Sequence, residues 1–146
     1  QLLDARPTAP APESVLYLGR RRRRRVLQEE ALLAALLRFS PHLQVVQDLD
    51  HLPVREQAEL VCSHRVVVGP HGAGFTHLLF ASEGPQVALE LMAEGNGSLA
   101  FALISQRFGI DHRIHIAEMV PSGHGDNYPD LRVNPEAVLA LLHSQS

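Results

Sequence analysis

The chain has 146 residues, 45% of them hydrophobic, and a formal net charge of −3. This length corresponds to one domain that can bury a core, and the acidic balance disfavours binding to a polyanion over the whole surface. No run of about 20 apolar residues predicts a membrane span, and the single cysteine, Cys62, excludes an internal disulfide. Because the chain begins with Gln1 and not with Met, we expect a piece of a longer protein, for which a missing targeting signal means little.

The apolar pattern predicts strands and helices in alternation. After a proline-containing lead-in over residues 1–13, the expected strands are short apolar runs: Val15–Leu18, Leu43–Val46, Val66–Val68, Val87–Leu91 and His112–Ile116. The expected helices carry apolar residues at helical spacing: Leu27–Phe39, Val54–Ser63, Gly74–Ala81, Leu99–Phe108 and a last helix that Asn134 caps and that ends near Leu142. This alternation is typical of an α/β fold with a Rossmann-like parallel sheet and helices on both faces.

A glycine-rich segment follows the third predicted strand. Gly69, Gly72 and Gly74 are expected to let the backbone turn sharply and come close to a ligand. A helix that begins near Gly74 would direct its unpaired N–H groups at the same place, an arrangement that binds phosphate or pyrophosphate. The alternative is a tight turn without a ligand. The spacing matches neither of two common phosphate motifs, and all 13 basic residues are arginine, so a nucleotide triphosphatase is disfavoured.

Six consecutive arginines, Arg20–Arg25, follow the first predicted strand. Three interpretations are open: a solvated surface turn, a nucleic-acid patch or nuclear signal, and a clamp in which one or two guanidinium groups bind a diphosphate. The acidic balance of the chain disfavours a nucleic-acid partner. Ligands of parallel sheets bind beyond the carboxyl ends of the strands. We therefore expect the arginines and the glycine-rich segment, which follow the first and third strands, to meet in space.

The segment Gly69–Phe80 also resembles the G-x-H-G-A-G-L-T-N signature of glycosyltransferase family 61. Further blocks resemble the family in the right order. Val15–Arg20 with Arg24–Glu30 is similar to a strand, an arginine, a spacer and an R-x-I-x-N-E block. Two more blocks, Val54–Gln57 and Val87–Leu91, resemble an apolar-x-E-Q element and a V-I-E-L strand. The resemblance covers most of the chain.

The resemblance implies the C-terminal, donor-binding half of a two-domain glycosyltransferase of the B type, here residues 14–146, with the N-terminal acceptor domain absent from this chain. It implies transfer of a sugar from a nucleotide diphosphate sugar, with UDP as the expected nucleotide, to a glycan or glycoprotein acceptor with inversion. It also implies an enzyme of the Golgi or endoplasmic reticulum lumen, anchored through a segment outside this chain. The general base, for which no residue is identified, would come from the absent half or from the cleft, so this chain alone is expected to be inactive.

Two departures from the family pattern leave a non-catalytic alternative open. Gln28 and His77 stand where the family has Asn, so the chain is alternatively a nucleotide-sugar-binding module or a degenerate member of the family. A dinucleotide-dependent oxidoreductase is disfavoured, because arginines stand where a G-x-G-x-x-G segment would follow the first strand.

The resemblance places the donor diphosphate between the arginines and the glycine-rich segment. It implies a clamp formed by Arg20 and Arg24, with Arg25 as an alternate for Arg24. His71 is expected to donate a hydrogen bond to a phosphate oxygen. The rest of the loop would contribute backbone N–H groups, from Gly72, Ala73 and Gly74.

Other polar residues have two interpretations each. Glu56 and Gln57 contact the nucleotide base or ribose, or they lie on the surface at a helix start. Glu90 is a buried carboxylate that needs a partner, such as a ribose hydroxyl or loop N–H groups, or it lies at an exposed strand end. Nine histidines, including the pair His112-x-x-His115, form no compact ligand set with Cys or Asp, so structural zinc is disfavoured. No cofactor is firmly expected, and dependence on a divalent metal stays open.

Overall fold

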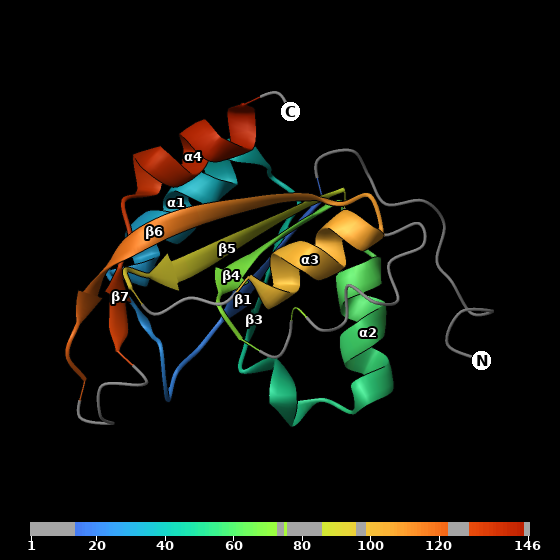
Figure 1. Cartoon of the computed structure of the whole chain (residues 1–146), viewed down its shortest axis with the longest axis horizontal. Coiled ribbons are helices and arrows are strands. Elements are labelled where there is room, and N and C mark those ends of the chain that lie inside the picture. The colour runs from blue at the N-terminus through green and yellow to red at the C-terminus, as the bar shows by residue number, and fades with distance from the viewer. Residues whose placement is uncertain (1–13, 73–74, 76–85, 96–98, 123–128, 145–146) are drawn as a thin grey trace.

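Seven strands form one sheet in the computed structural model, which describes residues 14–72, 75, 86–95, 99–122 and 129–144 (Figure 1). They are ordered β2-β7-β6-β5-β4-β1-β3, and every neighbouring pair is parallel except β6 with β7. The Rossmann-like α/β class and the five predicted strands are confirmed. The strands are β1 (Val15–Gly19), β2 (Val26–Leu27), β3 (Leu43–Gln47), β4 (Val66–Pro70), β5 (Val87–Ala93), β6 (Asp111–Val120) and β7 (Asp130–Arg132).

One edge of the sheet carries two strands that the sequence pattern does not predict. β7 pairs antiparallel with the end of β6, and β2 pairs parallel with β7. With two and three residues, these strands are too short for an alternating apolar pattern to stand out. The arginines between β1 and β2 therefore connect the strand beside edge strand β3 to the opposite edge of the sheet.

The helices agree with their predicted bounds to within two residues. Asn134 caps the last helix as expected, because its side chain accepts the backbone N–H groups of Glu136 and Ala137. The predicted helix Gly74–Ala81 and the lead-in over residues 1–13 lie outside the described residues. The described helices are α1 (Glu29–Phe39), α2 (Val54–Cys62), α3 (Ala100–Arg107) and α4 (Pro135–His143), with a 3-10 turn, η1 (Leu49–His51), before α2.

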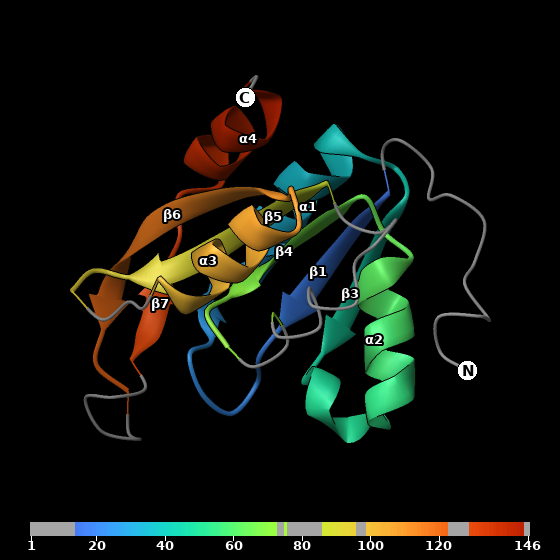
Figure 2. The same ribbon diagram turned by 45° about the vertical axis from the view of Figure 1, so that its right-hand side comes forward.

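Helices cover both faces of the sheet, so the sheet separates two apolar cores (Figures 1 and 2). α1 and α4 lie on one face, and α2 and α3 lie on the other. Side chains of a strand alternate between the two faces. Accordingly, Val15 and Tyr17 of β1 belong to the first core, and Leu16 and Leu18 belong to the second. None of the helices among the described residues is long and apolar enough to cross a membrane.

The strand order reverses at β1, which marks where a ligand can bind. β1 pairs with β3 on one side and with β4 on the other. The helices that follow β1 and β3 lie on opposite faces of the sheet. In sheets of this kind, ligands bind in the crevice beyond the carboxyl ends of the strands where the order reverses. Here that place lies at Gly19 and Pro70.

Candidate functional site

The segments that follow β1 and β4 contact each other, as the sequence predicts. Arg24 Nη1 donates to the backbone carbonyl of His71 at 3.1 Å. The guanidinium of Arg20 lies against Gly72, where a Cβ atom would be 2.5 Å from Arg20 Nη1. Two guanidinium groups thus lie beside the first residues of the glycine-rich segment.

The arginine loop, residues 20–25, is divided between surface and site. Arg20 and Arg24 are half-buried, whereas Arg21, Arg22, Arg23 and Arg25 are exposed. The two arginines that the family pattern singles out are therefore the two that turn inward. This placement fits a diphosphate clamp, and the role of the two arginines as a clamp stays a prediction.

Acidic residues hold the exposed part of the arginine loop. The backbone N–H of Arg21 donates to Asp48 at 3.1 Å, and Arg22 pairs with Asp50 at 3.2 Å. Arg25 donates to buried Asp130 through its backbone N–H and its guanidinium, with the shortest distance 2.9 Å. The hydrogen bond to Asp130, and then its charge, raise the pKa of Arg25. Arg25, the alternate for the clamp, is thus engaged at the far edge of the sheet.

The loop enters α1 through an unusual backbone conformation. Gln28, which precedes the helix, has a positive φ of 54° and makes no side-chain cap hydrogen bond. Asn adopts this left-handed conformation more readily than Gln does. The departure from the family pattern at position 28 therefore lies at a strained helix entry. The next residue, Glu29, is held by hydrogen bonds of 2.7 Å from the Tyr17 hydroxyl and from Gln47 Nε2. Burial, followed by the charge of Glu29, raises the pKa of Tyr17.

Gly69 is explained by a close approach of two strands and not by a turn. A Cβ atom at Gly69 would lie 2.7 Å from the carbonyl oxygen of Leu18 on β1. Gly69 lies inside β4, so the expectation that it provides a sharp turn is wrong, whereas Gly72 lies at a bend and its carbonyl accepts the Phe75 N–H at 3.1 Å. Ala73 and Gly74, and hence the predicted N–H groups of the helix start, lie outside the described residues.

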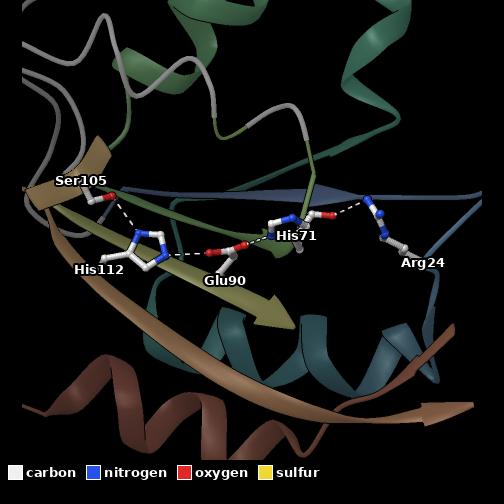
Figure 3. Close-up of polar contacts among 5 residues, drawn as sticks. All are labelled: Arg24, His71, Glu90, Ser105 and His112. Atoms are coloured by element: carbon white, nitrogen blue, oxygen red, sulfur yellow. Dashed lines mark hydrogen bonds and ion pairs between the residues drawn. The ribbon is translucent and has the colours of Figure 1, made fainter. Parts of the chain in front are cut away.

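A chain of buried polar side chains lies behind His71 (Figure 3). His71 Nδ1 contacts Glu90 Oε2, and His112 Nε2 contacts Glu90 Oε1 at 2.8 Å. Ser105 Oγ of α3 contacts His112 Nδ1 at 2.7 Å. We refer to His71, Glu90, Ser105 and His112 as the histidine cluster. The ring of Phe101 packs over it, 5.0 Å from the His71 ring between centroids.

Glu90 is fully buried in the middle of β5. The interpretation of Glu90 as an exposed strand end is therefore wrong, and its partners are two imidazole rings instead of loop N–H groups. Burial raises the pKa of the Glu90 carboxyl, but hydrogen bonds from His112 and His71 outweigh burial and lower that pKa overall. Glu90 is therefore a buried carboxylate at neutral pH.

Glu56 and Gln57 lie in the first turn of α2, at the same edge of the sheet. Glu56 is exposed. Gln57 Nε2 donates to the carbonyl of Leu52 at 2.7 Å and so closes the turn before the helix. Among the described residues, Glu56 forms no hydrogen bond or ion pair with Arg24 or with His71. A role of either side chain in binding base or ribose stays a prediction.

The role of His112 and Ser105 in this site is not predicted from the sequence. His112 and His115, three residues apart on β6, face opposite sides of the sheet. His112 reaches Glu90, whereas His115 Nε2 lies 3.4 Å from the backbone nitrogen of Asn134. Burial lowers the pKa of His115. The two rings therefore cannot share a metal ion, and the described residues contain no group of three His, Cys, Asp or Glu that could hold one. His77 and His124 lie outside the described residues.

Open surface for a ligand lies on either side of Arg20. Arg20 borders pockets of about 270 and about 300 Å³. The first is also lined by Arg22, Arg23, Asp48 and Asp50, and the second extends along the start of α1. A ligand in either pocket would reach Arg20 without rearrangement of the sheet.

The comparison with protein families covers the arginine loop and the start of the glycine-rich segment. The family described as Glycosyltransferase 61 matches residues 2–88, which is more than half of the chain. This region contains β1 to β4 and ends at the start of β5, before Glu90 and His112. No match was found among curated proteins. The resemblance seen in the motifs is confirmed, and the chain belongs to glycosyltransferase family 61.

Proposed function

We propose that this chain is the donor-binding half of a glycosyltransferase that uses a nucleotide diphosphate sugar, with UDP as the nucleotide. Membership of the family assigns the chain to the glycosyltransferases. One observation supports the finer assignment: Arg20 and Arg24 converge on His71 and Gly72 where the strand order reverses.

The chemistry of sugar transfer explains why cations belong there. As the bond to the sugar breaks, negative charge develops on the departing diphosphate. Guanidinium groups and backbone N–H groups fixed in advance around this charge stabilise the transition state. Two arginines bind phosphate oxygens with a geometry that a single positive point charge cannot provide.

The acceptor and its general base belong to a second domain in this proposal. The acceptor is a hydroxyl of a glycan or glycoprotein, and attack from the face opposite the leaving group gives inversion. The chain alone is therefore expected to bind donor and to transfer nothing.

Calorimetric titration of the chain with UDP tests this function. Arg20→Ala and Arg24→Ala should each weaken UDP binding about tenfold or more, since a hydrogen bond to a charged group contributes about 1.5–3 kcal/mol. Arg38→Ala is the matched control, because it removes an exposed arginine that pairs with Glu136 of α4 away from the arginine loop, and it should change the affinity less than about threefold. Equal losses in all three variants, or no saturable binding of UDP, would contradict the proposal.

A non-catalytic module is the second candidate, and Gln28 favours it. The strained left-handed conformation of Gln28 lies next to the proposed clamp. Adding the acceptor domain and testing hydrolysis or transfer of UDP-sugars separates the candidates. Saturable UDP binding without turnover in the longer protein supports the module, and turnover supports the enzyme.

A further inference from the structure

The direction of the hydrogen bonds in the histidine cluster can be assigned from Ser105. Ser105 is fully buried, and within the described residues its hydroxyl contacts only His112 Nδ1. A buried hydroxyl has one proton to donate and needs an acceptor for it. His112 Nδ1 is that acceptor, so it carries no proton. The network thereby assigns His112 as a neutral ring with its proton on Nε2, which donates to Glu90 Oε1.

One neighbouring group can then supply the positive charge that balances the Glu90 carboxylate. An ionised carboxylate that is fully buried needs a neighbouring positive charge. His112 is neutral in this arrangement, and within the described residues the ion-pair contacts of Glu90 are with the two imidazole rings and not with an arginine. The remaining group is the His71 ring, whose Nδ1 contacts Glu90 Oε2.

We infer that Glu90 is a positioning residue that keeps His71 as an imidazolium, with Nδ1–H on Glu90 and Nε2–H available to an anionic oxygen. Within the described residues, Nε2 has no hydrogen-bond partner. The His71 side chain keeps 20% of its surface exposed, while Glu90 has none. This inference rests on the proposed function for the identity of the anion, a phosphate oxygen of the nucleotide.

The groups around His71 explain why a buried carboxylate is needed. The arginine loop presents Arg20 and Arg24, two positive charges that disfavour a third. β6 presents His112, which is neutral, and α3 presents the ring of Phe101 and the hydroxyl of Ser105. Glu90 on β5 is the one negative group in contact with the ring among the described residues. It offsets the arginines, so that three cationic groups can surround one anion.

The protonation of His71 can be measured without any ligand. NMR of the ring nitrogens in the intact chain at neutral pH, assigned with a His71→Ala variant, should show a charged His71 and a neutral His112 with its proton on Nε2. In Glu90→Gln, the ring-nitrogen signals of His71 should move to those of a neutral ring, because an adjacent opposite charge is lost. Glu94→Gln is the matched control, since Glu94 is an exposed acid just after the same strand, and it should leave these signals unchanged.

The results that overturn the inference are distinct from failure of the proposed function. An uncharged His71 ring at neutral pH, or the same His71 ring-nitrogen signals in Glu90→Gln and Glu94→Gln, overturns it. UDP titration of both variants adds the functional readout: UDP should bind several-fold more weakly to Glu90→Gln than to Glu94→Gln at neutral pH, and the two affinities should converge as the pH falls. A Glu90-dependent shift of His71 in a chain that binds no UDP supports the protonation control and contradicts the proposed function.

Discussion

The arginine loop and the histidine cluster place their charges in different surroundings. Arg22 and Asp50 pair on the surface, where water and salt screen their attraction. Glu90 is fully buried, and the side chains of His71 and His112 keep 20% and 6% of their surface exposed, so an unpaired Glu90 would be costly. The difference teaches that an exposed pair of the loop contributes little to folding, whereas the cluster contributes through the partners of a buried carboxylate.

The largest expected effect is on stability, from removal of Glu90. Glu90→Ala leaves His71 and His112 without their shared acceptor in a buried site. Unfolding in urea should show a loss of about 3 kcal/mol. Glu94→Ala, an exposed control after the same strand, should change stability by less than about 0.5 kcal/mol. Similar losses in both variants would remove the distinction between the two regions.

Acid should weaken the histidine cluster through protonation of Glu90. The folded-state pKa of Glu90 lies below its unfolded value. Its contribution to stability is therefore complete above the unfolded pKa of about 4.3 and is lost as the pH falls through the folded value. The stability difference between the wild type and Glu90→Gln should shrink on acidification below about pH 4.3. A difference that stays constant to the acid limit of folding speaks against an ionised Glu90.

Asp130 offers an intermediate case, because a buried acid there binds an exposed arginine. The Asp130 side chain keeps 5% of its surface exposed, and that of Arg25 keeps 49%. Asp130→Asn should cost about 1–2 kcal/mol of stability, since charge-assisted hydrogen bonds are weakened but Asn still accepts one. Thermal unfolding of this variant should fall between those of Glu90→Ala and the wild type. A loss larger than that of Glu90→Ala would reverse the order proposed for the two regions.

The smallest effect is expected at the surface pair of the loop. Arg22 and Asp50 keep 75% and 71% of their side-chain surface exposed. Asp50→Asn should therefore change the free energy of unfolding by less than about 0.5 kcal/mol. Equilibrium unfolding at low and high salt checks this, and a loss above about 1 kcal/mol would show that the loop is not independent of folding.

The sequence predicts the parts of this molecule that depend on local pattern. Apolar runs place five strands correctly, and the residue types after β1 and β4 indicate where a ligand lies. Six consecutive arginines have identical side chains, so the local sequence does not indicate which of them would bind a ligand. Only the family pattern distinguishes Arg20 and Arg24 from the other four. The structure adds that these two turn inward.

The parts that depend on strand register could not be predicted in the same way. Glu90 is recognisable as a buried acid, but its partners are 19 and 22 residues away and meet it only through the pairing of β4, β5 and β6. The close approach that excludes a side chain at Gly69 likewise depends on the neighbouring strand β1. Two-residue and three-residue strands at the far edge are stabilised by tertiary pairing and have no pattern of their own.

Mapping the UDP site by NMR tests the central claim most directly. The claim is that the ends of β1 and β4 form the donor site, so titration of the chain with UDP should shift the backbone amide signals of residues 20–24 and 71–72 most strongly. The shifts should saturate with one affinity and should largely disappear in Arg20→Ala. Saturable shifts centred on α4 or on the β6-β7 edge, with unchanged signals for residues 20–24 and 71–72, would contradict the account.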